Sequence, residues 1–305
     1  MRSKFFSAIA TFATLAALAG CETGSDNPVP MTGRALRIVA NGFPNLKNGM
    51  LYEGWAILGG TPITTGKFNV NAAGKMINAV GTVIPNGEFS LGTDISAATA
   101  LVITIEPAVD PDPGPTDTHF LAGNITAGTA TLTAGGAQAL GNNFATAMGK
   151  FVLATPTNGM NTNEKSGVWF LDLSSGAPAQ GLNLPTLPAG WQYEGWTIVG
   201  GVPLTTGKFT NINAADLSAP FSGAMAGPPF PGEDYLMNAP AGLTFPLDLS
   251  GAKVAITIEP SPDDSPGPFL FKPLSGDIPA GAMDNVTFAM TNDSATMPTA
   301  MGTIR

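Results

Sequence analysis

Short stretches of alternating hydrophobic and polar residues run along most of the chain, and glycine, proline or asparagine separates each stretch from the next. In stretch 102–106 two isoleucines fall on one face of an extended chain, whereas Thr104 and Glu106 fall on the other. Pro107 ends this strand because proline has no amide hydrogen to donate to a neighbouring strand. Further strands are expected at 51–58, 63–70, 120–122, 130–133, 150–155 and 168–173. No helical periodicity follows residue 20, so the pattern predicts an all-β protein.

Most of the chain is one unit written twice. Residues 52–68 recur at 193–209 with 13 of 17 positions identical, and residues 101–115 recur at 254–268. The motif Ala-Met-Gly at 147–149 recurs at 300–302. Three landmarks in the same order predict two tandem antiparallel β-sandwich domains, one formed by each repeat.

The landmarks also give domain boundaries. We expect repeat 1 to span 34–157, a polar linker to span 158–167, and repeat 2 to span 168–305. The offset between the repeats grows from 141 to 153 residues, which indicates a 12-residue insertion in repeat 2. The loop-like segment 227–238 is its expected place and a candidate contact surface.

The N-terminal residues have the pattern of a targeting segment. Arg2 and Lys4 precede an apolar run at 5–17 that is too short to span a bilayer. The following Leu-Ala-Gly-Cys resembles a bacterial lipobox, so we expect residues 1–20 to be a lipoprotein signal peptide and Cys21 to be lipidated. Residues 21–33 then form a tether, and Glu22 favours the outer membrane, on its periplasmic face or at the cell surface. An ordinary secretory peptide with an incidental cysteine is the alternative.

The composition limits the possible functions. Glycine (38 residues) and proline (27) are abundant, charged residues make up 11%, and the formal net charge is −9. This acidic balance indicates no nucleic-acid partner, since nucleic-acid binding needs a basic patch. One histidine and one cysteine leave little material for zinc or thiol chemistry, and His119 has no G-x-S-x-G motif to pair with in a serine triad.

The order of the repeated motifs resembles the extracytoplasmic domain of the anti-sigma-K factor (RskA-like) family. The motifs in repeat 1 are Phe43-Pro-Asn-Leu46, Tyr-Glu-Gly-Trp, Gly-x-Pro, Thr-Gly-x-Phe, Ile-Thr-Ile-Glu-Pro, Gly114-Pro115 and Gly123. The resemblance implies a non-enzymatic β-sandwich outside the cytoplasm. The cytoplasmic sigma-binding domain and membrane helix typical of that family do not precede the repeats here, so it does not imply sigma-factor inhibition.

The residues retained in both repeats form a signature that we expect to be structural. In repeat 1 they are Tyr52, Glu53, Gly54, Trp55, Gly60, Pro62, Gly66, Lys67, Phe68, Glu106 and Pro107. In repeat 2 they are Tyr193, Glu194, Gly195, Trp196, Gly201, Pro203, Gly207, Lys208, Phe209, Glu259 and Pro260. The glycine inside each Glu-Gly-Trp strand suggests a bulge or a close backbone approach. The Gly-Gly pairs predict hairpin turns, and the tryptophans are expected to pack in the core, with stacking on a sugar or peptide as the alternative.

Two patterns of acidic residues allow alternatives. The retained glutamates of each repeat suit structural Glu–Lys pairs with Lys67 and Lys208 or strand-edge hydrogen bonds, with a glycosidase-type carboxyl pair as the alternative. Acidic loops in the two repeats contain Asp110, Asp112, Asp117, Asp263 and Asp264. They offer oxygen ligands for calcium but lack the EF-hand spacing. The sequence therefore predicts solvated acidic loops, no metal site and no cofactor.

These inferences favour a non-enzymatic, lipid-anchored cell-envelope protein that acts as a binding, scaffolding or sensing module. Its expected partners are the membrane, through the lipid, and an unidentified envelope protein or glycan. The first alternative is a regulatory sensor linked to an extracytoplasmic anti-sigma-factor system. The second is an enzyme that acts on polysaccharide or peptide, which the small inventory of catalytic residues disfavours.

Overall fold

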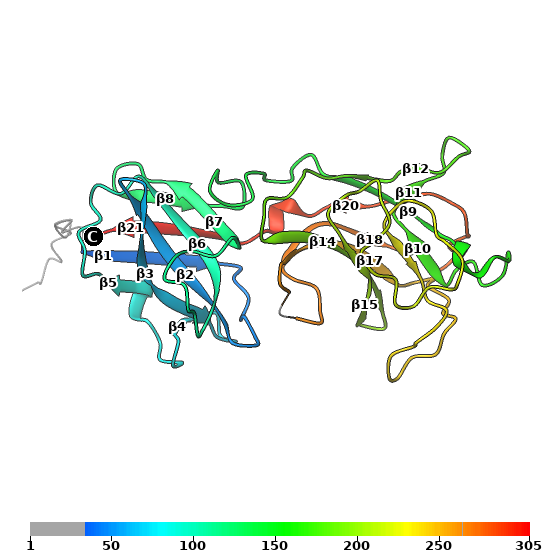
Figure 1. Cartoon of the computed structure of the whole chain (residues 1–305), viewed down its shortest axis with the longest axis horizontal. Coiled ribbons are helices and arrows are strands. Elements are labelled where there is room, and N and C mark those ends of the chain that lie inside the picture. The colour runs from blue at the N-terminus through cyan, green and yellow to red at the C-terminus, as the bar shows by residue number, and fades with distance from the viewer. Residues whose placement is uncertain (1–33, 264) are drawn as a thin grey trace, which may run out of the picture. The chain divides into compact units, whose positions relative to one another are not determined.

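The structure is a computed structural model that describes residues 34–263 and 265–305. The predicted signal peptide, the lipidation site at Cys21, the tether and Asp264 lie outside the described residues. The described part consists of antiparallel β-strands and three short 3-10 turns, which confirms the prediction of an all-β fold (Figure 1). Among the described residues, no helix has the length and apolar character needed to cross a membrane.

The first sandwich consists of two antiparallel sheets. One has the strand order β5-β1-β21-β8, and the other has the order β4-β3-β2-β6-β7. Their bounds are β1 Ala35–Asn41, β2 Met50–Leu58, β3 Thr61–Val70, β4 Met76–Asn78, β5 Glu88–Ser90, β6 Ala100–Pro107, β7 His119–Asn124, β8 Thr129–Leu132 and β21 Thr299–Ile304. The 3-10 turn η1 (Pro85–Gly87) precedes β5.

The second sandwich repeats this arrangement. Its sheets have the orders β13-β9-β10-β16, with β19 also paired to β9, and β15-β14-β17-β18-β20. Their bounds are β9 Met148–Leu153, β10 Gly167–Trp169, β13 Leu182–Asn183, β14 Trp191–Val199, β15 Val202–Phe209, β16 Gly232–Asp234, β17 Lys253–Pro260, β18 Phe271–Asp277, β19 Phe288–Ala289 and β20 Thr291–Asn292. A small ribbon pairs β11 (Leu171–Asp172) with β12 (Ala179–Gln180), and the turns η2 (Pro156–Asn158) and η3 (Ser294–Thr296) complete the elements.

The final strand of each repeat lies in the sandwich of the other repeat. Strand β21 pairs with β1 from Leu36↔Ile304 to Asn41↔Thr299, so the end of the chain completes the first sandwich (Figure 1). The matching strand of repeat 1, β9, pairs with β10 in the second sandwich. Residues 154–166 join β9 to β10, so this pairing closes a much shorter loop than a pairing of β9 with β1 would, and it leaves β1 for β21.

This exchange corrects the expectation that 34–157 and 168–305 each complete their own sheets. The segment 158–167, expected to link two domains, instead lies between β9 and β10 inside the second sandwich. The chain passes between the sandwiches in 133–147, which connects β8 to β9.

The expected position of the insertion is also wrong. Strand β16 pairs with β10 as β5 pairs with β1, so 227–238 contains the counterpart of an existing strand. Nine residues separate β5 from β6, whereas eighteen separate β16 from β17, so most of the extra length lies after β16. Glu233 and Tyr235 are fully buried, which removes them as surface contacts.

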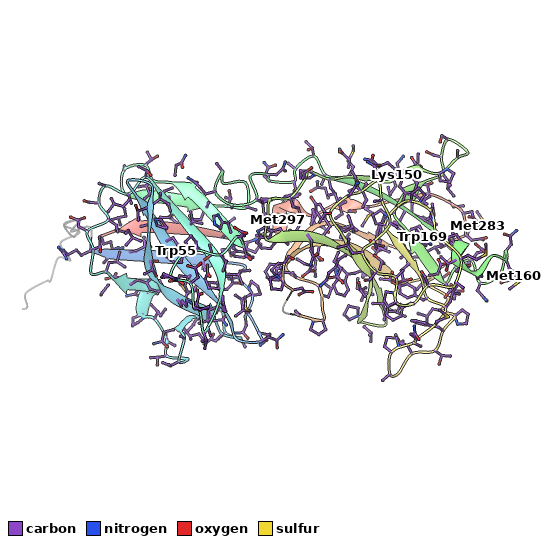
Figure 2. All side chains as sticks on the ribbon, in the orientation of Figure 1. Trp55, Lys150, Met160, Trp169, Met283 and Met297 are labelled. Atoms are coloured by element: carbon purple, nitrogen blue, oxygen red, sulfur yellow. The ribbon has the colours of Figure 1, made fainter. Side chains whose placement is uncertain are left out.

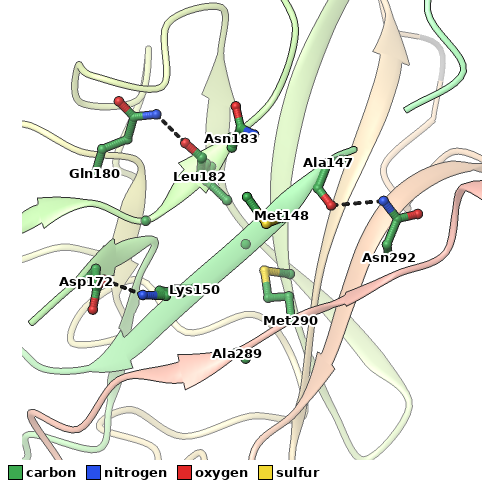
Figure 3. A pocket seen from close by; sticks show the side chains of 12 residues that line it. Ala147, Met148, Lys150, Asp172, Gln180, Leu182, Asn183, Ala289, Met290 and Asn292 are labelled. Atoms are coloured by element: carbon green, nitrogen blue, oxygen red, sulfur yellow. Dashed lines mark hydrogen bonds and ion pairs between the residues drawn. The ribbon is translucent and has the colours of Figure 1, made fainter. Parts of the chain in front are cut away.

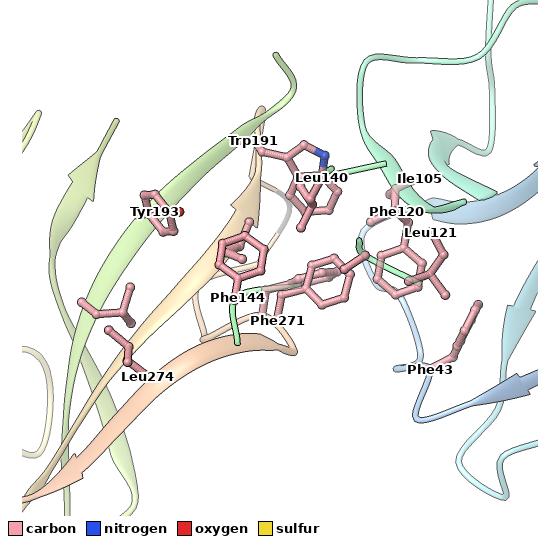
Figure 4. Close-up of a cluster of buried hydrophobic side chains, with 14 of the residues drawn as sticks. Phe43, Ile105, Phe120, Leu121, Leu140, Phe144, Trp191, Tyr193, Phe271 and Leu274 are labelled. Atoms are coloured by element: carbon pink, nitrogen blue, oxygen red, sulfur yellow. The ribbon is translucent and has the colours of Figure 1, made fainter. Parts of the chain in front are cut away.

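The two sandwiches share one hydrophobic core within a single compact unit. Phe120 of β7 stacks on Phe271 of β18 with ring centroids 4.8 Å apart, and Trp191 lies 5.7 Å from Phe271 (Figure 4). Asn292 donates hydrogen bonds to the backbone oxygens of Phe144 and Ala147 in the connecting segment. The junction is therefore packed like a protein interior.

Candidate functional site

The repeat signature lies on matching hairpins, β2–β3 and β14–β15. The register shifts at Gly54/Trp55 and at Gly195/Trp196, so each hairpin carries the bulge that the glycine predicts. A Cβ atom at Gly54 would lie 2.2 Å from the hydroxyl of Thr65, so a larger residue there would force the Thr65 side chain to move.

The remaining glycines and prolines of the signature shape the same hairpins. Gly60 and Gly201 close the two-residue turns with φ of +85° and +87°, a conformation that favours glycine. The other members take these positions: Pro62 and Pro203 lie opposite Ile57 and Ile198, Gly66 and Gly207 lie opposite Gly54 and Gly195, and Pro107 and Pro260 end β6 and β17.

The retained aromatic residues are buried. Tyr52 and Tyr193 stack on Phe68 and Phe209 with ring centroids 5.4 and 5.5 Å apart. Each tyrosine hydroxyl donates to a proline carbonyl eight residues earlier, Pro44 or Pro185. These contacts hold the start of each hairpin against the core.

The retained tryptophans begin a buried hydrogen-bond chain. Trp55 Nε1 donates to Thr104 Oγ1 at 2.8 Å, and that hydroxyl donates to Glu106 (Figure 2 shows Trp55). Trp196 makes the same 2.8 Å contact with Thr257, whose hydroxyl donates to Glu259. Both tryptophans are only 2–3% exposed, which fits the expected packing in the core, although Trp196 also lines a pocket described below.

In the first sandwich, a lysine lies among the retained acids. Lys67 Nζ is 3.7 Å from Glu53 Oε2 and 3.2 Å from Asp110 Oδ2, and it donates to the Pro107 carbonyl at 2.8 Å. Burial raises the pKa of Glu106 above its usual value. The expected Glu–Lys pair is therefore present here.

In the second sandwich, the corresponding lysine makes different contacts. Lys208 Nζ is 2.7 Å from Asp263 Oδ2, and no ion pair with Glu194 forms among the described residues. Glu194 Oε1 accepts a hydrogen bond from Thr205 at 2.6 Å, and Glu259 Oε1 accepts from the Phe269 amide at 2.8 Å. The expected Glu–Lys pair is replaced by an Asp–Lys pair.

The second cluster is strongly acidic and close-packed. One oxygen from each of Glu194, Glu259 and Asp263 lies within 4.8 Å of the others. Burial raises the pKa of Glu259 to about 8 and also raises the pKa of Glu194. Both shifts follow from removing carboxylates from water without enough positive charge nearby.

A pocket of about 610 Å³ opens beside this cluster. Glu194, Lys208 and Asp263 provide its charged groups. Its other lining residues are mainly apolar or hydroxyl-bearing: Trp196, Pro203, Leu204, Thr205, Ser218, Phe221, Pro240, Ser265 and Pro266. A mainly apolar lining with a few charged groups is typical of a ligand site.

A smaller pocket of about 390 Å³ lies where β9 meets β13 and β19 (Figure 3). Met148 and Met290 line it, and Lys150 forms an ion pair with Asp172 at 2.5 Å on one side. Lys150 is 46% exposed, so this pair is worth little to stability.

Two further buried acids, Glu233 and Asp234, and the half-buried Asp216 occur around β16, and the sequence pattern did not distinguish them from loop residues. Asp234 accepts hydrogen bonds from Trp169 Nε1 and the Thr157 amide, both at 2.7 Å. Asp216 accepts from the Gly232 amide, and Glu233 accepts from a serine hydroxyl. Burial raises the pKa of Asp216 to about 8 and that of Glu233 to about 7.

The acidic loop of repeat 1 uses its carboxylates locally. Asp110 accepts from the amide of Asp112 and from Lys67, and Asp112 accepts from the Gly114 amide. The Nδ1 atom of His119 is 2.6 Å from the carbonyl oxygen of Gln138, and its partner there is backbone rather than a serine.

Comparison with protein-family models, with curated proteins and with solved structures gave no match. The resemblance to the anti-sigma-K factor family therefore stays a prediction.

Proposed function

We propose that the protein is a non-enzymatic, lipid-anchored cell-envelope protein that binds a glycan or a segment of an envelope protein through its second sandwich. The supporting observation is the pocket beside Glu194, Lys208 and Asp263. Its apolar wall suits a sugar face or an apolar side chain, and its charged groups suit polar substituents. The lipid on Cys21 would hold this pocket outside the membrane to which the chain is attached.

The enzyme alternative has weaker support. A glycosidase-type mechanism needs two carboxyl groups that both reach the substrate. Glu259 is fully buried and does not line the pocket, although it lies close to Glu194. The regulatory alternative rests on the family resemblance alone.

In-cell photo-cross-linking of the full chain tests the proposal. A photoreactive residue replaces Ser218, which is exposed at the pocket, and a control chain carries it at exposed Ser90 of the first sandwich. We expect a cross-linked species from position 218 that the control lacks. The same species from both positions, or none from 218, would contradict the proposal.

The anchor needs a separate test. Cys21→Ser should move the protein from the membrane fraction to the soluble fraction of the envelope. A variant that stays with the membrane would show that the lipid on Cys21 is not the attachment.

A further inference from the structure

Each sandwich brings three carboxylates and one lysine together at its signature hairpin, a formal charge of −2 if all ionise, and the two glutamates of each group are buried. In the first sandwich, Lys67 contacts two of the carboxylates and a backbone carbonyl. In the second, Lys208 contacts only Asp263 among the three acids. The second cluster therefore has less compensation for its negative charge.

The second cluster also has more unsatisfied polar atoms. The Oε2 atoms of Glu194 and Glu259 are buried and have no hydrogen-bond partner, while these residues are 3% and 0% exposed. In the first cluster only Glu106 has such an oxygen. A buried carboxylate oxygen without a partner is costly unless a proton or a cation satisfies it.

We propose that Glu194, Glu259 and Asp263 form a binding site for a divalent cation in the second sandwich. The ligand atoms are the two free Oε2 oxygens and a carboxylate oxygen of Asp263. A set of carboxylate oxygens selects hard cations such as Ca²⁺ or Mg²⁺ over metals that prefer nitrogen or sulfur. This site does not depend on the proposed glycan or protein ligand.

The pocket gives the cation a route to the cluster. Glu194 and Asp263 line the pocket and also belong to the acidic group, whereas Glu259 lies behind them. Water in the pocket can supply the remaining ligands of the cation. Lys208 competes for Asp263, so its ammonium group must move or share that carboxylate when the cation binds.

The test uses Tb³⁺, a hard cation that binds oxygen ligands, added to the full-length protein in detergent. Trp196 is linked through Thr257 to Glu259, so excitation of tryptophan should sensitise Tb³⁺ emission at this site. We expect emission that Ca²⁺ reverses by competition. Glu259→Gln should weaken binding at least about tenfold, because a neutral amide replaces a charged ligand.

Glu106→Gln is the matched control, because it makes the same change at the equivalent position of the first sandwich. It should leave Tb³⁺ binding unchanged. Asp263→Asn, nearer the pocket, tests the site again if circular dichroism shows that Glu259→Gln disturbs folding. Absence of sensitised emission, full binding by Asp263→Asn, or equal losses in Glu259→Gln and Glu106→Gln would overturn the proposal.

Discussion

The two sandwiches hold the same signature residues in the same hairpin geometry, but the lysine of the signature contacts different acids in each. Lys67 is 21% exposed and lies between Glu53 and Asp110 in the first sandwich. Lys208 is 32% exposed and forms a short ion pair with Asp263 beside a pocket in the second. Retaining the residue types therefore preserved the hairpin and its hydrogen bonds but not the balance of buried charge.

The hydrogen-bond chains that begin at the two tryptophans are the same in both sandwiches. Trp55–Thr104–Glu106 and Trp196–Thr257–Glu259 have the same partners and the same 2.8 Å first contact. The hydrogen-bonded framework is thus common to both sandwiches, and they differ in which acids the lysine contacts. The same substitution made in each sandwich should therefore separate the effect of the framework from the effect of the lysine contacts.

The largest effect should come from removing the exchanged strand. Deleting residues 299–305 leaves β1 and β8 without the strand between them and exposes the core face of the first sandwich. We expect loss of cooperative folding in that sandwich, measured by circular dichroism and limited proteolysis. A synthetic peptide of residues 298–305 should restore protection, whereas a scrambled peptide should not. Unchanged melting of the shortened chain would contradict the strand exchange.

The shared core predicts that the sandwiches unfold together. Phe271→Ala removes a fully buried ring that stacks on Phe120, and we expect a loss of about 3–5 kcal/mol in the free energy of unfolding. Urea unfolding should show one transition displaced as a whole. Two transitions, with that of the first sandwich unmoved, would indicate that the junction does not couple them.

Removing a lysine should make the first cluster resemble the second. Lys67→Met leaves Glu53 and Asp110 without their ammonium partner, so it should lower the melting temperature by several degrees. We expect Ca²⁺ to restore part of that loss and Tb³⁺ stoichiometry to rise from one to two. Lys208→Met should keep one site and bind Tb³⁺ more tightly. If Lys67→Met still binds only one Tb³⁺, Lys67 is not what prevents a cation from binding to the first cluster.

The buried acids predict an unusual dependence of stability on pH. Burial raises the pKa values of Asp216 and Glu259 to about 8, so the folded protein binds more protons than the unfolded chain between about pH 4.5 and pH 8. The free energy of unfolding should therefore fall as the pH rises through this range. Without divalent cations, we expect a melting temperature roughly 5 °C or more higher at about pH 5.5 than at about pH 8.5.

Asp216→Asn identifies the source of that dependence. It should raise the melting temperature at about pH 8.5 and have little effect at about pH 5.5, because the amide resembles the protonated acid. Asp112→Asn, in an exposed loop of the first sandwich, is the control and should change neither value. An equal effect of Asp216→Asn at both pH values would show that its protonation is not involved.

The smallest expected effects are those of the paired tryptophans. Trp55→Phe and Trp196→Phe each remove one buried hydrogen bond and some packing, and each should lower the free energy of unfolding by about 1–2 kcal/mol. Urea denaturation of the two variants measures both. Losses that differ by more than about twofold would show that the two chains of contacts are not equivalent.

Much of the fold could be predicted from the sequence, because alternation, glycine turns and prolines act locally. The bulge at Gly54 and the turn at Gly60 follow from the residues themselves. The partner of β21 could not be predicted, because the Ala-Met-Gly motif occurs at both β9 and β21. Alternation of hydrophobic and polar residues predicts a strand but does not specify the strand with which it pairs. The predicted position of the insertion was wrong because the repeated motifs show only that it lies between 209 and 254, not where in that interval.

Most residues of the candidate site could be predicted from the sequence, but which acid pairs with the lysine could not. Glu194, Glu259 and Lys208 stand out because both repeats retain them, whereas Asp263 gains its importance from the fold that brings it to Lys208. Glu233 read as a loop residue because a three-residue strand gives almost no pattern, and only the structure shows its burial.

Anomalous diffraction from crystals of the protein soaked in Tb³⁺ would locate the bound cation itself. We expect one strong peak in contact with Glu194, Glu259 and Asp263 in the second sandwich, and no peak at Glu53, Glu106 and Asp110 in the first. Peaks of equal strength in both clusters, or a bound ion that avoids Glu259, would contradict a cation site that only the second sandwich provides.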